Sequence, residues 1–125
     1  MDPFVRLPEL LRETIVGIVR QRQDRLDLTA RQLAVLLVCY LDEGPHTMQG
    51  LAQRLGVAKS VISRAIDRLE LDDLAKRRPD PTNRRSIVVV RTIAGSAFMG
   101  ELRALMKSAS KGLGLSLAAP RSATG

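Results

Sequence analysis

The chain begins with hydrophobic positions spaced for one face of an amphipathic helix, between about Pro8 and Arg22. These positions are Leu10, Leu11, Ile15, Ile18 and Val19. A spacing of three and four residues brings such side chains together on one side of a helix. We therefore expect a first helix with a single apolar stripe.

A second helix is predicted to begin after Thr29, because Thr29 and Gln32 have the three-residue spacing of a capping box. The positions from Leu33 to Leu41 are apolar nearly all round such a helix, and Gly44-Pro45 follows them as a stop signal. A helix that is apolar on every side is typical of a core. We expect this helix to be central and buried.

Two further helices are predicted around a tight turn at Gly56. Thr47 can cap the first of them, over residues 48–55, and the second runs from about Lys59 to Asp72 without a capping side chain at Ala58. Glycine commonly ends a helix because it adopts a left-handed conformation at little cost. The arrangement is that of a helix-turn-helix.

The second of these two helices divides into an apolar face and a polar face. The apolar positions are Val61, Ile62, Ala65, Ile66 and Leu69, and the polar stripe consists of Ser60, Ser63, Arg64 and Asp67. Small hydroxyl side chains beside an arginine are suited to a helix that lies in the major groove of DNA.

A basic hairpin is predicted next, with strands at residues 75–77 and 86–91. Thr92 would then cap a last helix, whose apolar face is formed by Phe98, Leu102, Leu105, Met106 and Ala109. The predicted fold class is mostly α with a small β-hairpin wing, a winged helix-turn-helix with terminal dimerisation helices. The expected boundaries are 1–27 for an N-terminal dimerisation helix, 28–91 for the winged helix-turn-helix, 92–111 for a C-terminal dimerisation helix and 112–125 for a flexible tail.

The net charge of the chain indicates a negatively charged partner. The formal net charge is +7 and the isoelectric point is about 10.7. Residues 1–58 carry seven basic and seven acidic side chains, whereas residues 59–91 carry nine and five. The excess positive charge therefore begins where the candidate recognition helix begins, which favours a nucleic acid as the partner.

Several classes of function lack the residues that they need. With one cysteine and one histidine, the chain cannot build an intrachain disulfide or a usual zinc cluster. No nucleophile–base pair, paired carboxylates or glycine-rich phosphate loop occurs, so neither an enzyme nor a cofactor is expected. The longest apolar run, from Leu33 to Leu41, is about half the length that spans a bilayer, and no secretion signal is expected. We expect a cytoplasmic protein without a membrane partner.

Five groups of residues together resemble the MarR family of bacterial transcription regulators over roughly residues 28–100. They are Leu28-Thr29-x-x-Gln32, Leu51-Ala52, Leu55-Gly56-Val57, Ser63-Arg64-x-x-Asp67-Arg68-Leu69 and Asp80-Pro81-x-Asn83-Arg84-Arg85. The resemblance implies a homodimer that binds a pseudo-palindromic operator on double-stranded DNA, usually as a repressor. It also implies that the helix from Lys59 reads the major groove and that Arg85 reaches the minor groove.

The residues expected to contact DNA lie on the predicted recognition helix and on the wing. They are Lys59, Ser60, Ser63, Arg64, Arg68, Arg77, Arg84 and Arg85. Arg64 is expected to contact bases or the groove, the alternatives being a phosphate contact or a solvated charge. Asp67 is expected to pair with a neighbouring arginine, since a carboxylate facing phosphates is unfavourable. The alternative function is a winged-helix protein-interaction module without specific DNA readout.

Three positions depart from the pattern of the family. Asn83 stands where the wing usually has an aspartate, so we expect a looser wing, and Arg91 stands where a leucine is usual. A single convincing helix follows the wing where two are usual, so we expect a smaller or weaker dimer.

The sequence offers few residues for regulation by redox chemistry or by a ligand. Cys39 lies in the most apolar helix, where a thiol is inert, and it is not expected to be a redox switch. Tyr40 could line a ligand pocket, but the chain has three aromatic residues in all. A small-molecule effector is therefore possible but unsupported.

Overall fold

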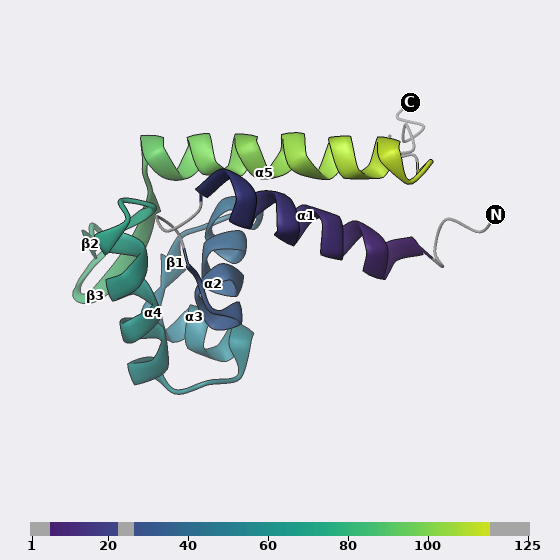
Figure 1. Cartoon of the computed structure of the whole chain (residues 1–125). Coiled ribbons are helices and arrows are strands. Elements are labelled where there is room, and N and C mark those ends of the chain that lie inside the picture. The colour runs from purple at the N-terminus through teal and green to yellow at the C-terminus, as the bar shows by residue number, and fades with distance from the viewer. Residues whose placement is uncertain (1–5, 23–26, 116–125) are drawn as a thin grey trace, which may run out of the picture. The chain divides into compact units, whose positions relative to one another are not determined.

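The computed structural model describes residues 6–22 and 27–115 and shows five helices and three strands in them (Figure 1). The order of elements is α1 (Leu7–Arg22), α2 (Ala30–Leu41), β1 (His46–Thr47), α3 (Met48–Leu55), α4 (Lys59–Leu71), β2 (Ala75–Asp80), β3 (Asn83–Arg91) and α5 (Ile93–Gly112). The chain divides into two compact units. One is Asp27–Met99, and the other combines the two terminal segments.

The helices begin where local capping predicts. The Oγ1 of Thr29 accepts a hydrogen bond from the backbone of Gln32 at 3.2 Å, and the Gln32 side chain accepts one from the Thr29 backbone at 2.9 Å. This confirms the capping box. Thr47 accepts from the backbone of Gly50 at 2.9 Å at the start of α3, and Gly56 ends that helix in the left-handed region at φ 68°.

The core of the Asp27–Met99 unit lies between α2, α3 and α4. Its largest fully buried aliphatic side chains are Val35, Leu36, Leu51, Ile62, Ile66 and Leu69. The predicted apolar face of α4 is confirmed, but α2 is not buried on all sides. Leu41 is 61% exposed and Leu33 and Leu37 are half-buried, because neighbouring elements cover only part of its circumference.

The sheet is larger than the sequence predicted. Its order is β1-β3-β2 with antiparallel pairing throughout, and β1, which was not predicted, pairs His46 with Val89 and Thr47 with Val88. Strand β2 extends to Asp80 although it contains Pro79. It is an edge strand, where a residue that cannot donate a ladder hydrogen bond is tolerated.

The terminal unit pairs α1 with the second half of α5, and the two helices lie side by side in Figure 1. A Cβ added at Gly17 would lie 2.7 Å from the Cδ2 of Leu105, so the helices approach closely there. Arg22 and Glu101 form an ion pair at 2.8 Å. Near the end of α5, the hydroxyl of Ser110 donates to the carbonyl of Leu115, which follows the helix, at 2.8 Å. Most of the tail expected at 112–125 lies outside the described residues.

The base of the wing is attached to α2 through Tyr40. Its hydroxyl donates to the carbonyl of Leu74 at 2.7 Å and accepts from the backbone of Thr92 at 3.0 Å. The Thr92 side chain accepts from the backbone of Gly95 at 2.9 Å, which confirms the predicted cap of α5. A Cβ at Gly95 would lie 1.7 Å from the Tyr40 hydroxyl, so only glycine leaves room for it.

We expect Gly95→Ala to destabilise the fold by roughly 2 kcal/mol or more, since it overpacks a tight site and displaces the buried hydroxyl of Tyr40. Gly100→Ala is the matched control on the same helix, because a Cβ there meets nothing within 4 Å and alanine favours helix. Urea unfolding measures both. Equal midpoints for the two variants would contradict the packing of Tyr40 against Gly95.

Candidate nucleic-acid interface

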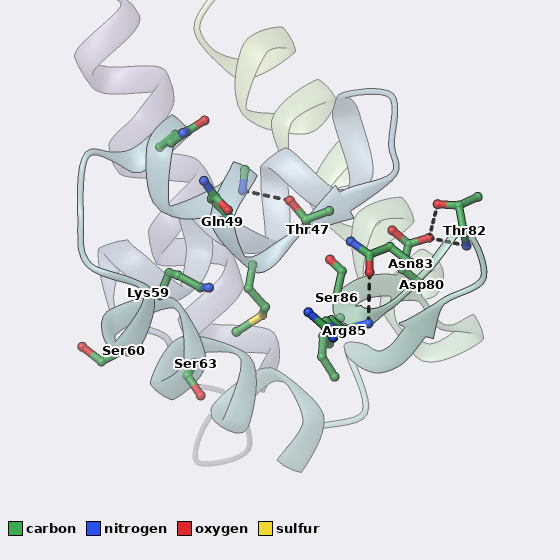
Figure 2. A pocket seen from close by; sticks show the side chains of 14 residues that line it. Thr47, Gln49, Lys59, Ser60, Ser63, Asp80, Thr82, Asn83, Arg85 and Ser86 are labelled. Atoms are coloured by element: carbon green, nitrogen blue, oxygen red, sulfur yellow. Dashed lines mark hydrogen bonds between the residues drawn. The ribbon is translucent and has the colours of Figure 1, made fainter.

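A hollow of about 860 Å³ lies between α3, α4 and the tip of the wing (Figure 2). Most of the residues that line it are polar: Thr47, Gln49, Gly50 and Gln53 near or on α3, Lys59, Ser60 and Ser63 on α4, and Asp80, Thr82, Asn83, Arg85 and Ser86 on the wing. Met48 and Ile87 add apolar surface. Four of the eight predicted contact residues therefore line one concave surface. Sequence reasoning missed the contribution of α3, because its polar residues carry no charge signal.

The tip of the wing is closed by side chains that hydrogen-bond to nearby backbone. A carboxylate oxygen of Asp80 accepts from the backbone and the hydroxyl of Thr82 at 2.9 and 2.7 Å. These hydrogen bonds stabilise the charged form and lower the pKa of Asp80 below its ordinary value. The amide oxygen of Asn83 accepts from the backbone of Arg85 at 3.1 Å. Asn83 thus fixes the backbone of the wing arginine without a carboxylate.

Arg64 does not line this hollow. It lines a smaller recess of about 150 Å³ together with Val61 and Ala65 of α4 and Thr29, Arg31 and Gln32 at the start of α2. Both arginines are exposed, and neither has a polar partner among residues 6–22 and 27–115. Arg31 was not predicted, because only the packing of α2 against α4 brings it beside Arg64.

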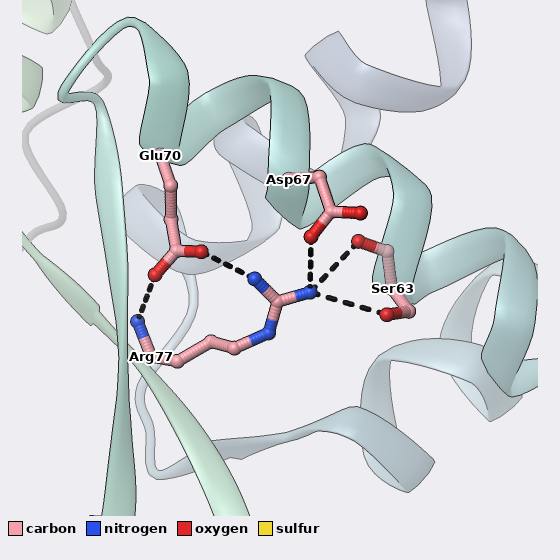
Figure 3. Close-up of polar contacts among 4 residues, drawn as sticks. All are labelled: Ser63, Asp67, Glu70 and Arg77. Carbon is pink, nitrogen blue, oxygen red and sulfur yellow. Dashed lines mark hydrogen bonds and ion pairs between the residues drawn. The ribbon is translucent and has the colours of Figure 1, made fainter.

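The predicted contacts Arg68 and Arg77 both form ion pairs within the protein. Arg68 pairs with Asp72 on the same helix at 3.1 Å. The guanidinium of Arg77 contacts three residues of α4, as Figure 3 shows: Glu70, Asp67 at 2.8 Å, and the carbonyl and hydroxyl of Ser63 at 2.9 and 3.1 Å. The expectation that Asp67 pairs with an arginine is confirmed. Arg84 is exposed on the wing and has no polar partner in the described part of the chain.

Arg91 has a structural position. Its Nε donates to the carbonyl of Cys39 at 2.8 Å and an Nη donates to that of Asp42 at 3.4 Å. The guanidinium also lies 5.6 Å from the centre of the Tyr40 ring. A cation at the carboxyl end of a helix and over an aromatic face is favourable in both contacts. Arg91 therefore joins the end of β3 to the end of α2.

Cys39 is buried, with 1% of its surface exposed. Burial raises the pKa of its thiol to about 11, although the charge of Arg91 acts in the opposite direction. Within the described ranges, no group of three or more histidine, cysteine or acidic side chains could hold a metal ion. In the same ranges no helix is both long and apolar enough to cross a membrane.

The fold and this surface define a winged helix-turn-helix protein, and comparisons with known proteins identify its family. The family model described as "MarR family" matches residues 26–86. The crystal structure of MarR is 30% identical, with a TM-score of 0.62, over 86% of this chain and 77% of that one. A transcriptional regulator from Thermotoga maritima is 29% identical, with a TM-score of 0.70, over 89% and 78%. The chain belongs to the MarR family, whose members are transcription regulators and not enzymes.

A curated relative is the HTH-type transcriptional repressor NicR of Pseudomonas putida. It is 30% identical over 83 residues, which are 66% of this chain and 52% of NicR. The chain therefore spans about half the length of this relative.

We expect the native protein to react very slowly with a thiol reagent at mildly alkaline pH, because a thiol with a pKa of about 11 stays protonated there. Unfolding in guanidinium chloride should expose one reactive thiol per chain. Ellman's reagent measures both states. Fast stoichiometric reaction of the folded protein would contradict the structural role of Cys39.

Proposed function

We propose that the chain is a sequence-specific regulator of transcription that binds double-stranded DNA, and that it acts as a repressor at a pseudo-palindromic operator. The observation that supports this best is the hollow between α4 and the wing, where Lys59, Ser60, Ser63 and Arg85 meet. The similarity to NicR, which is a transcriptional repressor, supports the proposed role as a repressor. A regulator of this kind acts on the chromosome, so we expect it in the cytoplasm.

The proposed roles follow the position of each side chain. Helix α4 would enter the major groove and present Ser60 and Ser63 to base edges, with Lys59 near a phosphate. Arg84 and Arg85 would reach the adjacent minor groove or its phosphates. A structurally similar chain, MepR of S. aureus, has been solved in complex with DNA, at 18% identity and a TM-score of 0.68. At that identity the likeness concerns the fold alone.

Arg64 is proposed to act together with Arg31 on a backbone phosphate beside the major groove. Their recess faces α2 and not the wing, and two cations without partners in the described residues suit an anion better than a base edge. We therefore favour a phosphate contact for Arg64 over the base contact that the sequence analysis expected.

We also propose that two copies of the chain join through the terminal helices, mainly through α1. Phe98 and Leu102 of α5 are 2% and 8% exposed, so they leave little surface for a partner. A row of apolar side chains on α1 is exposed: Leu7, Leu11, Ile15, Val16 and Val19, at 38–64%. A recess of about 330 Å³ between α1 and α5 is lined by Leu105, Ala109 and Leu113 together with Glu13, Ser108 and Gly112. Adjoining apolar surfaces usually mark a contact, and two copies about one helical turn apart would read a longer site.

DNA affinity should fall on the order of a thousandfold between 50 and 200 mM salt, because each neutralised phosphate releases counterions. Arg85→Ala should reduce the slope of log affinity against log salt by about one. Fluorescence anisotropy with a labelled duplex measures both. Affinity that stays flat across this range would contradict the proposed function and favour a protein-interaction module.

Leu11→Asp should shift the protein from dimer to monomer at low micromolar concentration and weaken operator binding, because it places a charge in the proposed apolar contact. Leu41→Asp is the control, since Leu41 is similarly exposed at 61% against 64% but belongs to the other unit. Sedimentation velocity reports the oligomeric state. If both variants remain dimeric, α1 does not form the contact.

A further inference from the structure

Arg77 connects the wing to the candidate recognition helix more extensively than any of the other predicted contact residues. It lies on the edge strand β2, and its partners Ser63, Asp67 and Glu70 are spaced four and three residues apart on one face of α4 (Figure 3). The side chain of Arg77 is 24% exposed, against 66% for Asp67. Most of the Arg77 side chain is therefore buried.

Glu70 accepts hydrogen bonds from both the backbone and the side chain of Arg77. One carboxylate oxygen accepts from the guanidinium, and the other accepts from the backbone N–H of Arg77 at 2.9 Å. That N–H belongs to an edge strand, whose outward groups have no neighbouring strand to pair with. Glu70 thus attaches α4 to the wing at a side chain and at the backbone.

The same contacts change the charge of the recognition helix. Asp67 and Glu70 are two carboxylates on α4, and carboxylates beside phosphates oppose DNA binding. Arg77 lies against both of them and offsets part of that charge. A guanidinium is well suited to this position, because its planar fork can hold several acceptors at once.

We propose that Arg77 is a positioning residue and not a DNA contact: with Glu70 as its anchor, it fixes the wing relative to α4 and masks the carboxylates of the recognition helix. This inference rests on the proposed DNA-binding function. Removing a carboxylate near DNA usually strengthens binding. Here, removing the negative charge of Glu70 should weaken specific binding and leave non-specific binding unchanged or stronger.

The test begins with a duplex selected by the wild-type protein from a random-sequence library, and a scrambled duplex of the same composition. Dissociation constants are then measured for wild type, Glu70→Ala and Glu43→Ala. Glu43 is the charge-matched control, exposed and without a polar partner in the described residues. We expect Glu70→Ala to lose about tenfold in affinity for the selected duplex, which is within the coupling seen inside one polar network.

The scrambled duplex should be bound by Glu70→Ala as tightly as by wild type or more tightly, and Glu43→Ala should lose no specific affinity. Arg77→Lys should show the same specific loss as Glu70→Ala, since lysine keeps the charge but not the fork. If Glu70→Ala instead tightens both duplexes, or if Arg77→Lys binds like wild type, the positioning role is wrong.

A second measurement does not depend on DNA. Hydrogen exchange at the backbone amides of β2 and at the second half of α4 should become faster in Glu70→Ala than in Glu43→Ala. Unchanged exchange would overturn the attachment of the wing to α4. If wild type selects no duplex at all, the proposed function fails, whereas the exchange data still decide whether Arg77 holds the wing.

Discussion

The hydroxyl of Tyr40 is the contact on which the geometry of the winged-helix unit depends. It bridges the carbonyl of Leu74, just before β2, and the backbone N–H of Thr92, just after β3. Both ends of the hairpin are therefore attached to one buried side chain of α2. The absence of a side chain at Gly95 makes room for this hydroxyl, and Arg91 covers the ring from above while it binds the end of α2.

Further along the wing, other side chains fix its position. Near the middle of β2, Arg77 connects the hairpin to α4 through charged hydrogen bonds. At the tip, Asp80 and Asn83 fix the turn through hydrogen bonds to Thr82 and to the backbone of Arg85. The wing is thus held at its base, its middle and its tip by different side chains. A preorganised wing would lose less conformational entropy when it binds, which favours affinity.

The sequence predicted those features that depend on neighbours along the chain. The caps at Thr29 and Thr47 and the turn at Gly56 are local, and all three were found where expected. The length of β2 could not be predicted, because Pro79 is tolerated only where a strand lies at the edge of a sheet. The position of an edge is a property of the tertiary structure. The same holds for α2, whose exposed face was decided by what packs beside it.

Some features of the candidate site could likewise be predicted from the sequence, and others depend on the tertiary structure. Lys59, Ser60, Ser63 and Arg85 were predicted from residue type and position, and they line one hollow. Arg68 and Arg77 look alike in the sequence, as basic residues near the recognition helix, but they pair with Asp72 and with Asp67 and Glu70. Arg31 carried no signal in the sequence beyond its place in a capping box. The sequence therefore did not reveal which of these basic side chains form ion pairs within the protein, because their partners depend on the packing of the wing against α4.

We propose that DNA binds on the concave surface formed by the start of α4 and the tip of the wing. The most direct measurement is nuclear magnetic resonance of the isotope-labelled protein, titrated with a duplex selected by the protein itself. We expect the largest amide shifts at residues 59–64 and 82–86, and small shifts in the first half of α1. Shifts concentrated on α1, with none on α4 or the wing tip, would contradict the claim.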